Sequence, residues 1–248
     1  MPNRLDSAEM SPSELQRELD ARLRVLSQGS LYAADANEPD PRYRGYGVRM
    51  PAMRALLKDY RKTFKALPRD RALELARALI DSGYGEQKTI ALELLLPMDD
   101  YFTPERLDEL EALFRKLYGW SKIDGFAGKL LQKVLMRHPR PVVERASGWS
   151  QDPDLWLRRA SVVLYTRKVA ESGRFHDAAL ANCERLKFDE EDMVRKGVGW
   201  CLKDLMRGDR ERVIDYVSGL RRQGVSSVVT LYAIRDLKGD DRRRVLDA

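Results

Sequence analysis

From Pro51 onward, the chain reads as a succession of short amphipathic segments whose apolar residues recur at the helical period. Prolines and acidic residues mark the starts of these segments, and glycines such as Gly173 and Gly208 mark their ends. No stretch shows sustained alternation of apolar and polar residues, so we expect an all-α chain without a β-sheet. The expected helices span 51–66, 69–82, 86–96, 104–118, 120–137, 140–149, 153–171, 174–187, 190–207, 209–223 and 225–238.

The region before Pro51 is expected to hold one helix and one irregular segment. Ser11-Pro12-Ser13-Glu14 carries helix-start chemistry, and the leucines that follow it recur at the helical period. Residues 1–10 are expected to be a frayed terminus, and residues 11–248 a single helical-repeat domain. Residues 29–50 place tyrosines and arginines between helix breakers. This segment is either a connecting loop or a loop that contacts nucleic acid by stacking and by phosphate binding.

Two of the expected helices carry similar short sequences, which suggests an internal repeat. Leu157-Arg158-Arg159-Ala160 and Val194-Arg195-Lys196-Gly197 lie 37 residues apart. This separation is slightly below the period of about 40–47 residues found in repeats of paired helices. Because such pairs stack on their neighbours, we expect a right-handed superhelical solenoid of antiparallel helix pairs, with a concave basic face suited to a duplex.

Composition favours a polyanionic partner and argues against a metal site. The chain has 43% hydrophobic and 34% charged residues, which is typical of a globular protein with a charged surface. Its formal net charge of +6 favours binding to a polyanion such as nucleic acid. Cys183 and Cys201 fit no metal or disulfide spacing and are expected to be reduced, partly buried thiols. With only two histidines besides, no zinc site is expected. The sequence shows neither a signal peptide nor a membrane-spanning run, so a cytoplasmic protein is expected.

The helix expected to open at Trp120 carries an acid at the edge of its apolar face. Asp124 lies beside a stripe of apolar residues, one turn after Trp120, so the two side chains share a face. A carboxylate in that position is costly unless something pairs with it. Gly125 and Gly128 flank it and allow close approach to the backbone. This arrangement indicates a site. Alternatively, Asp124 is an acid of the second turn that the helix dipole favours, or half of a structural ion pair, and Trp120 is a core residue.

A second tryptophan is expected on a polar helix face. In the helix over 192–207, the buried side is formed by Val194, Val198, Cys201, Leu202 and Leu205. Trp200 points away from that side and has Lys196, Lys203 and Arg207 as neighbours. The indole could pack on the next repeat under the lysine stems. We favour an aromatic platform for a nucleotide, with the cations holding phosphates.

One of two adjacent arginines is expected on an apolar face. The helix over 154–170 is apolar nearly all round, and Arg159 has apolar residues as its one-turn neighbours. A guanidinium there requires an anion, which could be an acid on an adjacent helix or a DNA phosphate. Arg158 is the alternative candidate, because periodicity does not separate the two.

Four motifs together make the chain similar to a known family. They are Tyr46-Gly47-Val48-Arg49-Met50-Pro51, Trp120-Ser121-Lys122-Ile123-Asp124, Leu155-Trp156-Leu157-Arg158-Arg159-Ala160 and Val198-Gly199-Trp200-Cys201-Leu202. In this order and at these separations, the chain resembles the DNA alkylation repair glycosylases of the AlkD type, which are built of HEAT-like helical repeats. The resemblance extends from Tyr43 to about Ile234.

The resemblance implies roles for individual residues. Asp124 matches the catalytic carboxylate, and Trp120 and Trp200 match two indoles that frame the deoxyribose of the lesion. Arg159 matches an arginine that contacts phosphate, and the segment from Tyr46 to Arg49 matches an early DNA-contacting loop. The chain departs from some relatives, which carry glutamine at Arg49, an acid at Ser121 and arginine-glutamate at Lys203-Asp204. These departures bear on substrate range and on contacts near the abasic product.

The resemblance therefore implies a monofunctional DNA glycosylase of base excision repair. Its substrates would be cationic N3- or N7-alkylated purines in duplex DNA, because a positively charged base leaves as a neutral species. No metal or organic cofactor is expected, nor a membrane partner, and the protein is expected to be a monomer that associates with the nucleoid when bound to DNA. The main alternative is a non-catalytic helical-repeat scaffold for DNA or an acidic protein. A further alternative is an RNA-binding repeat protein.

Overall fold

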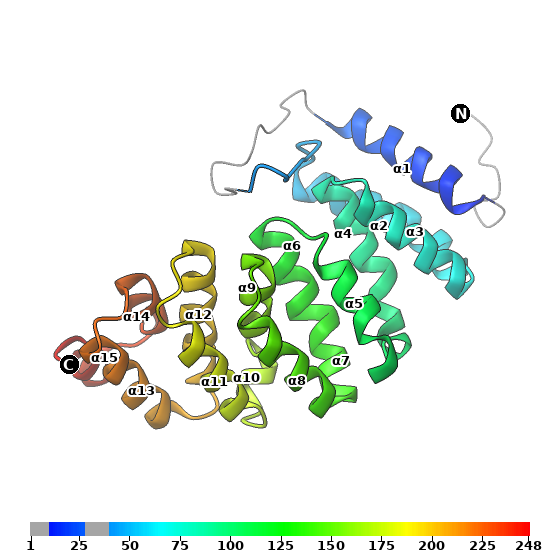
Figure 1. Cartoon of the computed structure of the whole chain (residues 1–248). Coiled ribbons are helices and arrows are strands. Elements are labelled where there is room, and N and C mark those ends of the chain that lie inside the picture. Colours follow the sequence, from blue (N-terminus) through cyan, green and yellow to red (C-terminus); the bar gives the residue numbers. More distant parts are fainter. Residues whose placement is uncertain (1–9, 28–39) are drawn as a thin grey trace. The chain divides into compact units, whose positions relative to one another are not determined.

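The structure, a computed structural model, describes residues 10–27 and 40–248 (Figure 1). Every regular element in these two ranges is helical, and the backbone pairing of Arg44 with Tyr84 is an isolated bridge. The predicted all-α class is therefore confirmed. None of the described helices is long and apolar enough to cross a membrane. The predicted frayed terminus lies outside the described residues except for Met10.

The chain divides into two compact units after Gly125. The first contains α1 (Pro12–Leu26), α2 (Met50–Ala66), α3 (Arg69–Asp81), α4 (Gly85–Leu95), α5 (Leu107–Phe114) and α6 (Trp120–Gly125), with 3₁₀ turns η1 (Leu96–Tyr101) and η2 (Pro104–Arg106). The second contains η3 (Phe126–Leu131), α7 (Gln132–Arg137), α8 (Pro139–Trp149), α9 (Leu155–Val163), α10 (Lys168–Glu171), α11 (His176–Leu186), α12 (Asp192–Leu205), α13 (Arg210–Arg222), α14 (Ser227–Ala233) and α15 (Gly239–Leu246). The single domain over 11–248 stays a prediction.

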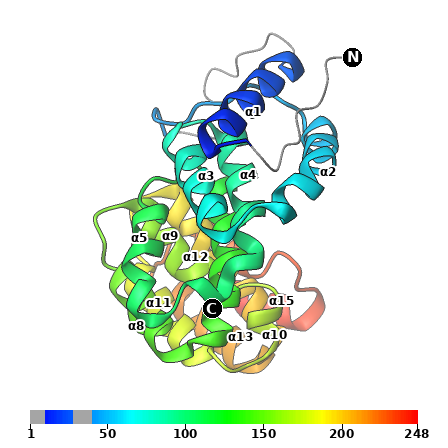
Figure 2. The ribbon, with the colours of Figure 1, turned by 90° about the vertical axis from the view of Figure 1, so that its right-hand side faces the viewer.

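Helix α4 is the centre of the first unit. It packs against α1, α2, α3 and α6, and α1 also packs on α3 (Figure 2). Ile90, Ala91 and Leu95 on α4 are completely buried, so the helix has apolar contacts on more than one side. The start of α1 is fixed by a capping box, in which the Ser11 side chain accepts from the Glu14 N–H and the Glu14 carboxylate accepts from the Ser11 N–H. The helix start predicted at Ser11 is confirmed.

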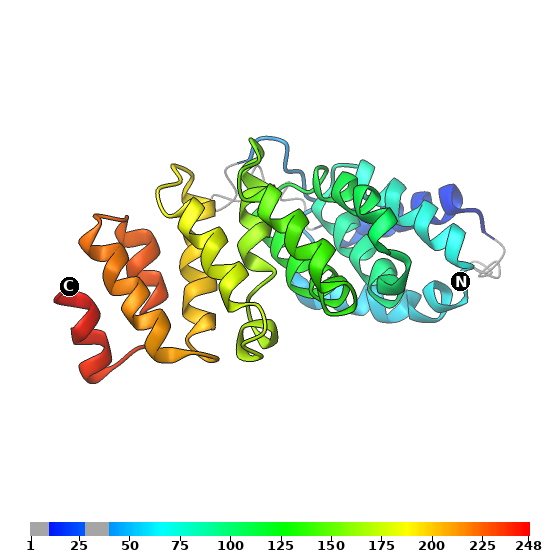
Figure 3. The same cartoon turned by 60° about the horizontal axis from the view of Figure 1, so that its bottom comes forward.

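The second unit is built of helix pairs in two layers. Helices α9, α12 and α14 lie in sequence in one layer, with α12 packed between the other two. Helix α11 packs behind α9 and α12, and α13 packs behind α12 and α14 (Figure 3). Short loops join α8 to α9, α11 to α12 and α13 to α14, so the helices of each pair run antiparallel. This is the stacking of helix pairs that the internal repeat predicted.

Several predicted boundaries were wrong, for local reasons. The helix expected over 153–171 stops at Val163 and resumes at Lys168, because Arg167 takes a positive φ of 58° that no helix allows. The helix expected over 225–238 ends at Ala233, and the one expected over 104–118 ends at Phe114. Gly239 follows the last expected helix but opens a further helix, α15, whose first turn carries two acids that suit a helix N-terminus.

The two cysteines meet although they are distant in sequence. Cys183 on α11 and Cys201 on α12 are free thiols and are completely buried, more deeply than predicted. The packing of α11 on α12 brings their side chains into hydrogen-bonding contact, which together with burial raises the pKa of Cys201. Sequence spacing could not predict this pair, because helix packing creates it.

Lys88 on α4 is a buried cation of the first unit. Only 1% of its surface is exposed, and its Nζ donates a 2.6 Å hydrogen bond to the Lys116 carbonyl. The same Nζ lies 4.1 Å from the centre of the Tyr118 ring. Burial lowers the pKa of Lys88 to about 8, and the nearby charges of Lys122 and Arg42 act in the same direction. The fold therefore disfavours the charged form of Lys88 relative to the unfolded chain.

Lys88 makes the unfolding free energy depend on pH. Its folded pKa of about 8 lies below the unfolded value of about 10.4, so the unfolded chain binds more protons between these values. We therefore expect stability to rise from pH 8 to about 10, by up to about 1.4 kcal/mol per pH unit relative to Lys88→Met. Urea unfolding at pH 7, 8, 9 and 10 measures this difference, with Lys238→Met as the exposed control. Parallel curves for wild type and Lys88→Met would contradict the prediction.

Candidate active site and nucleic-acid interface

Helix α6 places Trp120 and Asp124 on one face, as predicted. Gly119, with a positive φ of 89°, turns the chain into the helix, and its carbonyl accepts the first helical hydrogen bonds. Trp120 at the first position is 39% exposed, whereas Asp124 one turn later is only 7% exposed. The apolar stripe beside them is buried as predicted, at Ile123, Ala127, Leu130, Leu131 and Val134. An open indole therefore stands beside a carboxylate that is largely withdrawn from solvent.

The helix directly following Asp124 has an unusual geometry. Residues 126–131 form a π-helix, a wider turn that is rare in proteins and frequent at functional sites. The two predicted close approaches to glycine occur here. A Cβ at Gly125 would lie 3.3 Å from Leu92 Cδ2, and one at Gly128 would lie 3.0 Å from Arg167 Nη1. Gly125 therefore leaves room for a side chain of α4, and Gly128 leaves room for the guanidinium of Arg167.

Trp200 carries a cation on its ring. The buried side of α12 is formed by the predicted apolar residues, and Trp200 is half-buried on another face. The guanidinium carbon of Arg167 lies 5.3 Å from the centre of the indole, within the range of a cation–π interaction. Both predicted lysines on this helix have acidic partners. Lys196 lies 3.6 Å from Asp192, whereas Lys203 lies 3.0 Å from Asp204.

Arg167 was missed by sequence reasoning. It is the one non-glycine residue with positive φ in the described ranges, and such a conformation costs about 1–3 kcal/mol. Its backbone N–H donates a 2.8 Å hydrogen bond to Oδ2 of Asp204, which is 2% exposed, and its Nη1 donates a long 3.4 Å bond to the Gly128 carbonyl. These contacts hold a strained residue so that its guanidinium covers Trp200. No sequence pattern indicates them, because the partners lie more than 35 residues away.

Arg159 is packed between two helices of the second unit. It is 5% exposed, and its Nη1 donates to the carbonyl of Met193 at the start of α12. A Cβ at Gly197 would lie 3.3 Å from Arg159 Cγ, so the glycine allows α9 and α12 to approach closely here. Arg159 is therefore buried where α9 packs on α12. Its assignment to a DNA phosphate stays a prediction.

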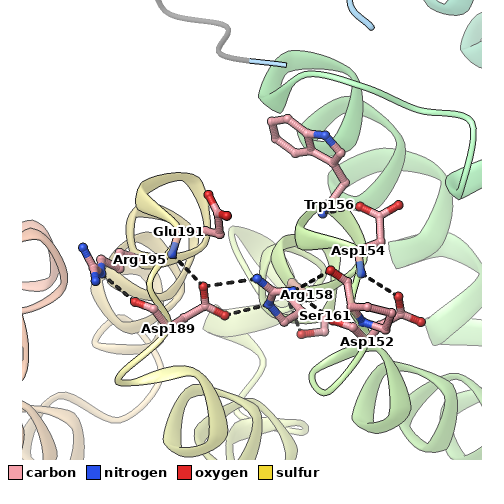
Figure 4. A network of polar contacts seen from close by, with 9 residues as sticks. Asp152, Asp154, Trp156, Arg158, Ser161, Asp189, Glu191 and Arg195 are labelled. Atoms are coloured by element: carbon pink, nitrogen blue, oxygen red, sulfur yellow. Dashed lines mark hydrogen bonds and ion pairs between the residues drawn. The ribbon is translucent and has the colours of Figure 1, made fainter. Parts of the chain in front are cut away.

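Arg158 links the two loops that precede α9 and α12 (Figure 4). Its Nε donates a 2.7 Å hydrogen bond to Asp189, and its Nη1 donates to the carbonyls of Asp152 and Pro153, each at 2.9 Å. The Asp189 carbonyl in turn accepts from Arg195 at 2.6 Å. Arg158 is thus already supplied with an anion and two carbonyls, an arrangement that stabilises the entry to both helices.

The early loop is held against the first unit. Tyr46 is buried, stacks on Tyr84 with ring centres 4.3 Å apart, and exchanges hydrogen bonds through its hydroxyl with Asp20 and Gln87. Glu86 accepts from the backbone N–H of Tyr46 at 3.1 Å. These contacts give Tyr46 the role of an anchor. Arg49 at the start of α2 is exposed, so of these two predicted DNA contacts it is the accessible one.

Comparison with known proteins identifies the family. The family model described as DNA alkylation repair enzyme matches residues 41–237. The chain belongs to this family. A solved structure described as a predicted DNA alkylation repair enzyme from Enterococcus faecalis is similar over 90% of this chain and 95% of that chain, with a TM-score of 0.67 and 16% identity. At this identity the likeness shows a shared fold. A search of curated proteins finds no match.

Membership of the DNA alkylation repair enzyme family gives the site residues their context. The family name supports an enzyme whose substrate is DNA. Within the described residues, no group of three His, Cys, Asp or Glu side chains is placed to hold a metal ion. On α6, the buried carboxylate of Asp124 lies one helical turn after the exposed indole of Trp120.

Proposed function

We propose that the protein is a monofunctional DNA glycosylase of the AlkD type. It would hydrolyse the N-glycosidic bond of cationic N3- or N7-alkylated purines in duplex DNA, as part of base excision repair. The observation that carries this proposal is the placement of Asp124 one turn from an exposed indole, in a member of the DNA alkylation repair enzyme family. A carboxylate and an aromatic face are two groups that stabilise a positively charged sugar.

Asp124 is the catalytic group in this proposal. Alkylation at N3 or N7 leaves the purine positively charged, so the base departs as a neutral species without needing a general acid. As the bond to C1′ breaks, positive charge builds on the sugar, and a carboxylate close by stabilises it. The same carboxylate can orient the water that adds to C1′ and can accept its proton. The low exposure of Asp124 strengthens this field, because little water screens it.

The two tryptophans contribute aromatic faces. Trp120 is exposed on α6 and can lie against the deoxyribose. The face of Trp200 already holds the guanidinium of Arg167, which supports the idea that this ring stabilises a cation. Binding of a sugar at Trp200 would then require the Arg167 side chain to leave the ring, and a DNA phosphate is a suitable new partner for it.

The remaining candidates fall into two groups. Arg49 and Lys196 are accessible and suit direct phosphate contacts. Arg158, Arg159 and Lys203 are engaged with protein groups, so in this proposal they shape the DNA-facing surfaces of α9 and α12. Tyr46 similarly fixes the loop that carries Arg49.

The proposal is tested with a duplex that carries one 7-methylguanine. We expect the purified protein to release free 7-methylguanine, to leave an abasic site that alkali cleaves, and to leave the strand intact before alkali. An unmodified duplex of the same sequence is the control and should release no base. Tight duplex binding without base release would favour the non-catalytic scaffold. Strand cleavage without alkali would contradict monofunctional chemistry.

A further inference from the structure

Helix α2 carries a line of cations on its exposed face. These residues are Arg54, Lys58, Arg61, Lys62 and Lys65. At about 100° per residue, they fall within roughly a third of a turn, and they extend along about 16 Å of the helix. We call this set the α2 stripe. The acid of the helix, Asp59, lies about a third of a turn from the centre of the stripe.

The opposite face of α2 holds the helix on the first unit. Met53, Leu56 and Tyr60 are buried there, and the Tyr60 hydroxyl donates a 2.5 Å hydrogen bond to Glu18 on α1. The stripe is therefore presented to solvent by a helix whose apolar side is already occupied. All of the stripe residues are exposed.

The stripe has no ionic partner within the described part of the chain. None of the stripe side chains forms an ion pair or hydrogen bond among the described residues, whereas α13 and α15 pair cations with acids. Like charges three and four residues apart destabilise a helix by about 0.2–0.5 kcal/mol per pair. Arg54 and Lys58, Lys58 and Lys62, and Arg61 and Lys65 are such pairs. A helix that accumulates this repulsion without compensation is suited to an external polyanion.

We propose that the α2 stripe binds the sugar-phosphate backbone of duplex DNA without reading sequence. A linear array of anions matches a linear array of cations, and lysine and arginine are the residues that hold phosphates. The stripe consists only of arginine and lysine, with no Asn or Gln to pair with adenine, no acid to pair with cytosine and no aromatic ring to stack on a base. All five side chains can contact phosphates. The identity of the polyanion as DNA rests on the proposed function.

A membrane surface fits α2 less well. A helix that lies on a membrane inserts an apolar face between the lipids. In α2 that face is packed on the first unit, through Met53, Leu56 and Tyr60. Helix α2 therefore presents charged side chains to solvent but has no exposed apolar face that could insert into a membrane.

The salt dependence of duplex binding measures the number of phosphate contacts. The test replaces all five stripe residues with glutamine and measures Kd for an undamaged duplex by fluorescence anisotropy from 50 to 200 mM NaCl. Each phosphate contact contributes about 0.9 to the slope of log K against log salt. We expect the variant to bind more weakly and its slope to be shallower by about 4, so that wild type loses about 10²–10³-fold more affinity over this range.

A matched control separates the stripe from total charge. Replacing Arg77, Arg210, Arg212, Arg243 and Arg244 with glutamine also removes five cations, all of which are paired with acids, on α5, α11, α13 and α15. We expect this variant to keep the wild-type slope, and circular dichroism with thermal unfolding checks that both variants are folded.

Three outcomes would count against the inference. Equal slopes for the two variants, both below wild type, would mean that net charge alone matters. A stripe variant that binds duplex like wild type but no longer binds vesicles with 30% anionic lipid would assign the stripe to membranes. In either case the proposed glycosylase would stand, because base release is measured separately. Failure of wild type to bind any duplex would overturn both proposals.

Discussion

Replacing Asp124 with asparagine is expected to lower the single-turnover rate of 7-methylguanine release by about 10²–10³-fold or more. Asparagine keeps the size and shape of the side chain but has no negative charge to stabilise the sugar cation. Because the interaction forms mainly in the transition state, we expect the Kd for damaged duplex to change less than about threefold. Quenched single-turnover reactions at saturating protein measure the rate, and anisotropy measures the affinity.

Asp99 provides the matched control for this substitution. It belongs to the same unit, lies on η1, and is 8% exposed against 7% for Asp124. Asp99→Asn therefore neutralises a similarly buried carboxylate on a different element of the same unit. We expect its excision rate to stay within about threefold of wild type. If Asp124→Asn excises at the wild-type rate, or if both variants lose activity equally, Asp124 is not the catalytic carboxylate.

The sequence predicts the residues of α6 and α12 well because the helical period fixes which side chains share a face. Trp120 and Asp124 are four residues apart, and the buried side of α12 leaves Trp200 on another face. These relations depend only on local geometry. The contacts of Tyr46 could not be predicted in the same way, because Asp20, Tyr84 and Glu86 are brought to it by the packing of α1 and α4.

The interruptions within helices could not be predicted from the sequence. Residues 164–167 contain neither glycine nor proline, so the apolar pattern runs on without a sign of the break at Arg167. The break depends on Asp204, which lies 37 residues later and accepts the Arg167 N–H. The π-helix at 126–131 is similar, since nothing in its composition distinguishes it from an ordinary helix. At Arg167 a tertiary contact therefore overrides the local pattern.

Asp204→Ala is expected to destabilise the protein by about 2–4 kcal/mol. The Asp204 carboxylate is buried, accepts the Arg167 N–H at 2.8 Å and lies 3.0 Å from Lys203 Nζ. Removing it deletes a charge-assisted hydrogen bond and leaves the strained Arg167 backbone without its main support. Asp236→Ala is the control, because Asp236 also pairs with Lys203, at 3.3 Å, but is 63% exposed. It should cost less than about 1 kcal/mol.

A second substitution tests whether support of Arg167 is the reason for that cost. Glycine adopts a φ of 58° without strain, so Arg167→Gly in the Asp204→Ala background should restore about 1 kcal/mol or more. In the wild-type background, Arg167→Gly should raise the free energy of unfolding by less. There the Asp204 bond already holds the backbone, and the contact of the guanidinium with Trp200 is lost. Urea unfolding of the four proteins measures this coupling. Additive effects, or an Asp204→Ala cost no larger than that of Asp236→Ala, would show that Asp204 does not hold the residue that covers Trp200.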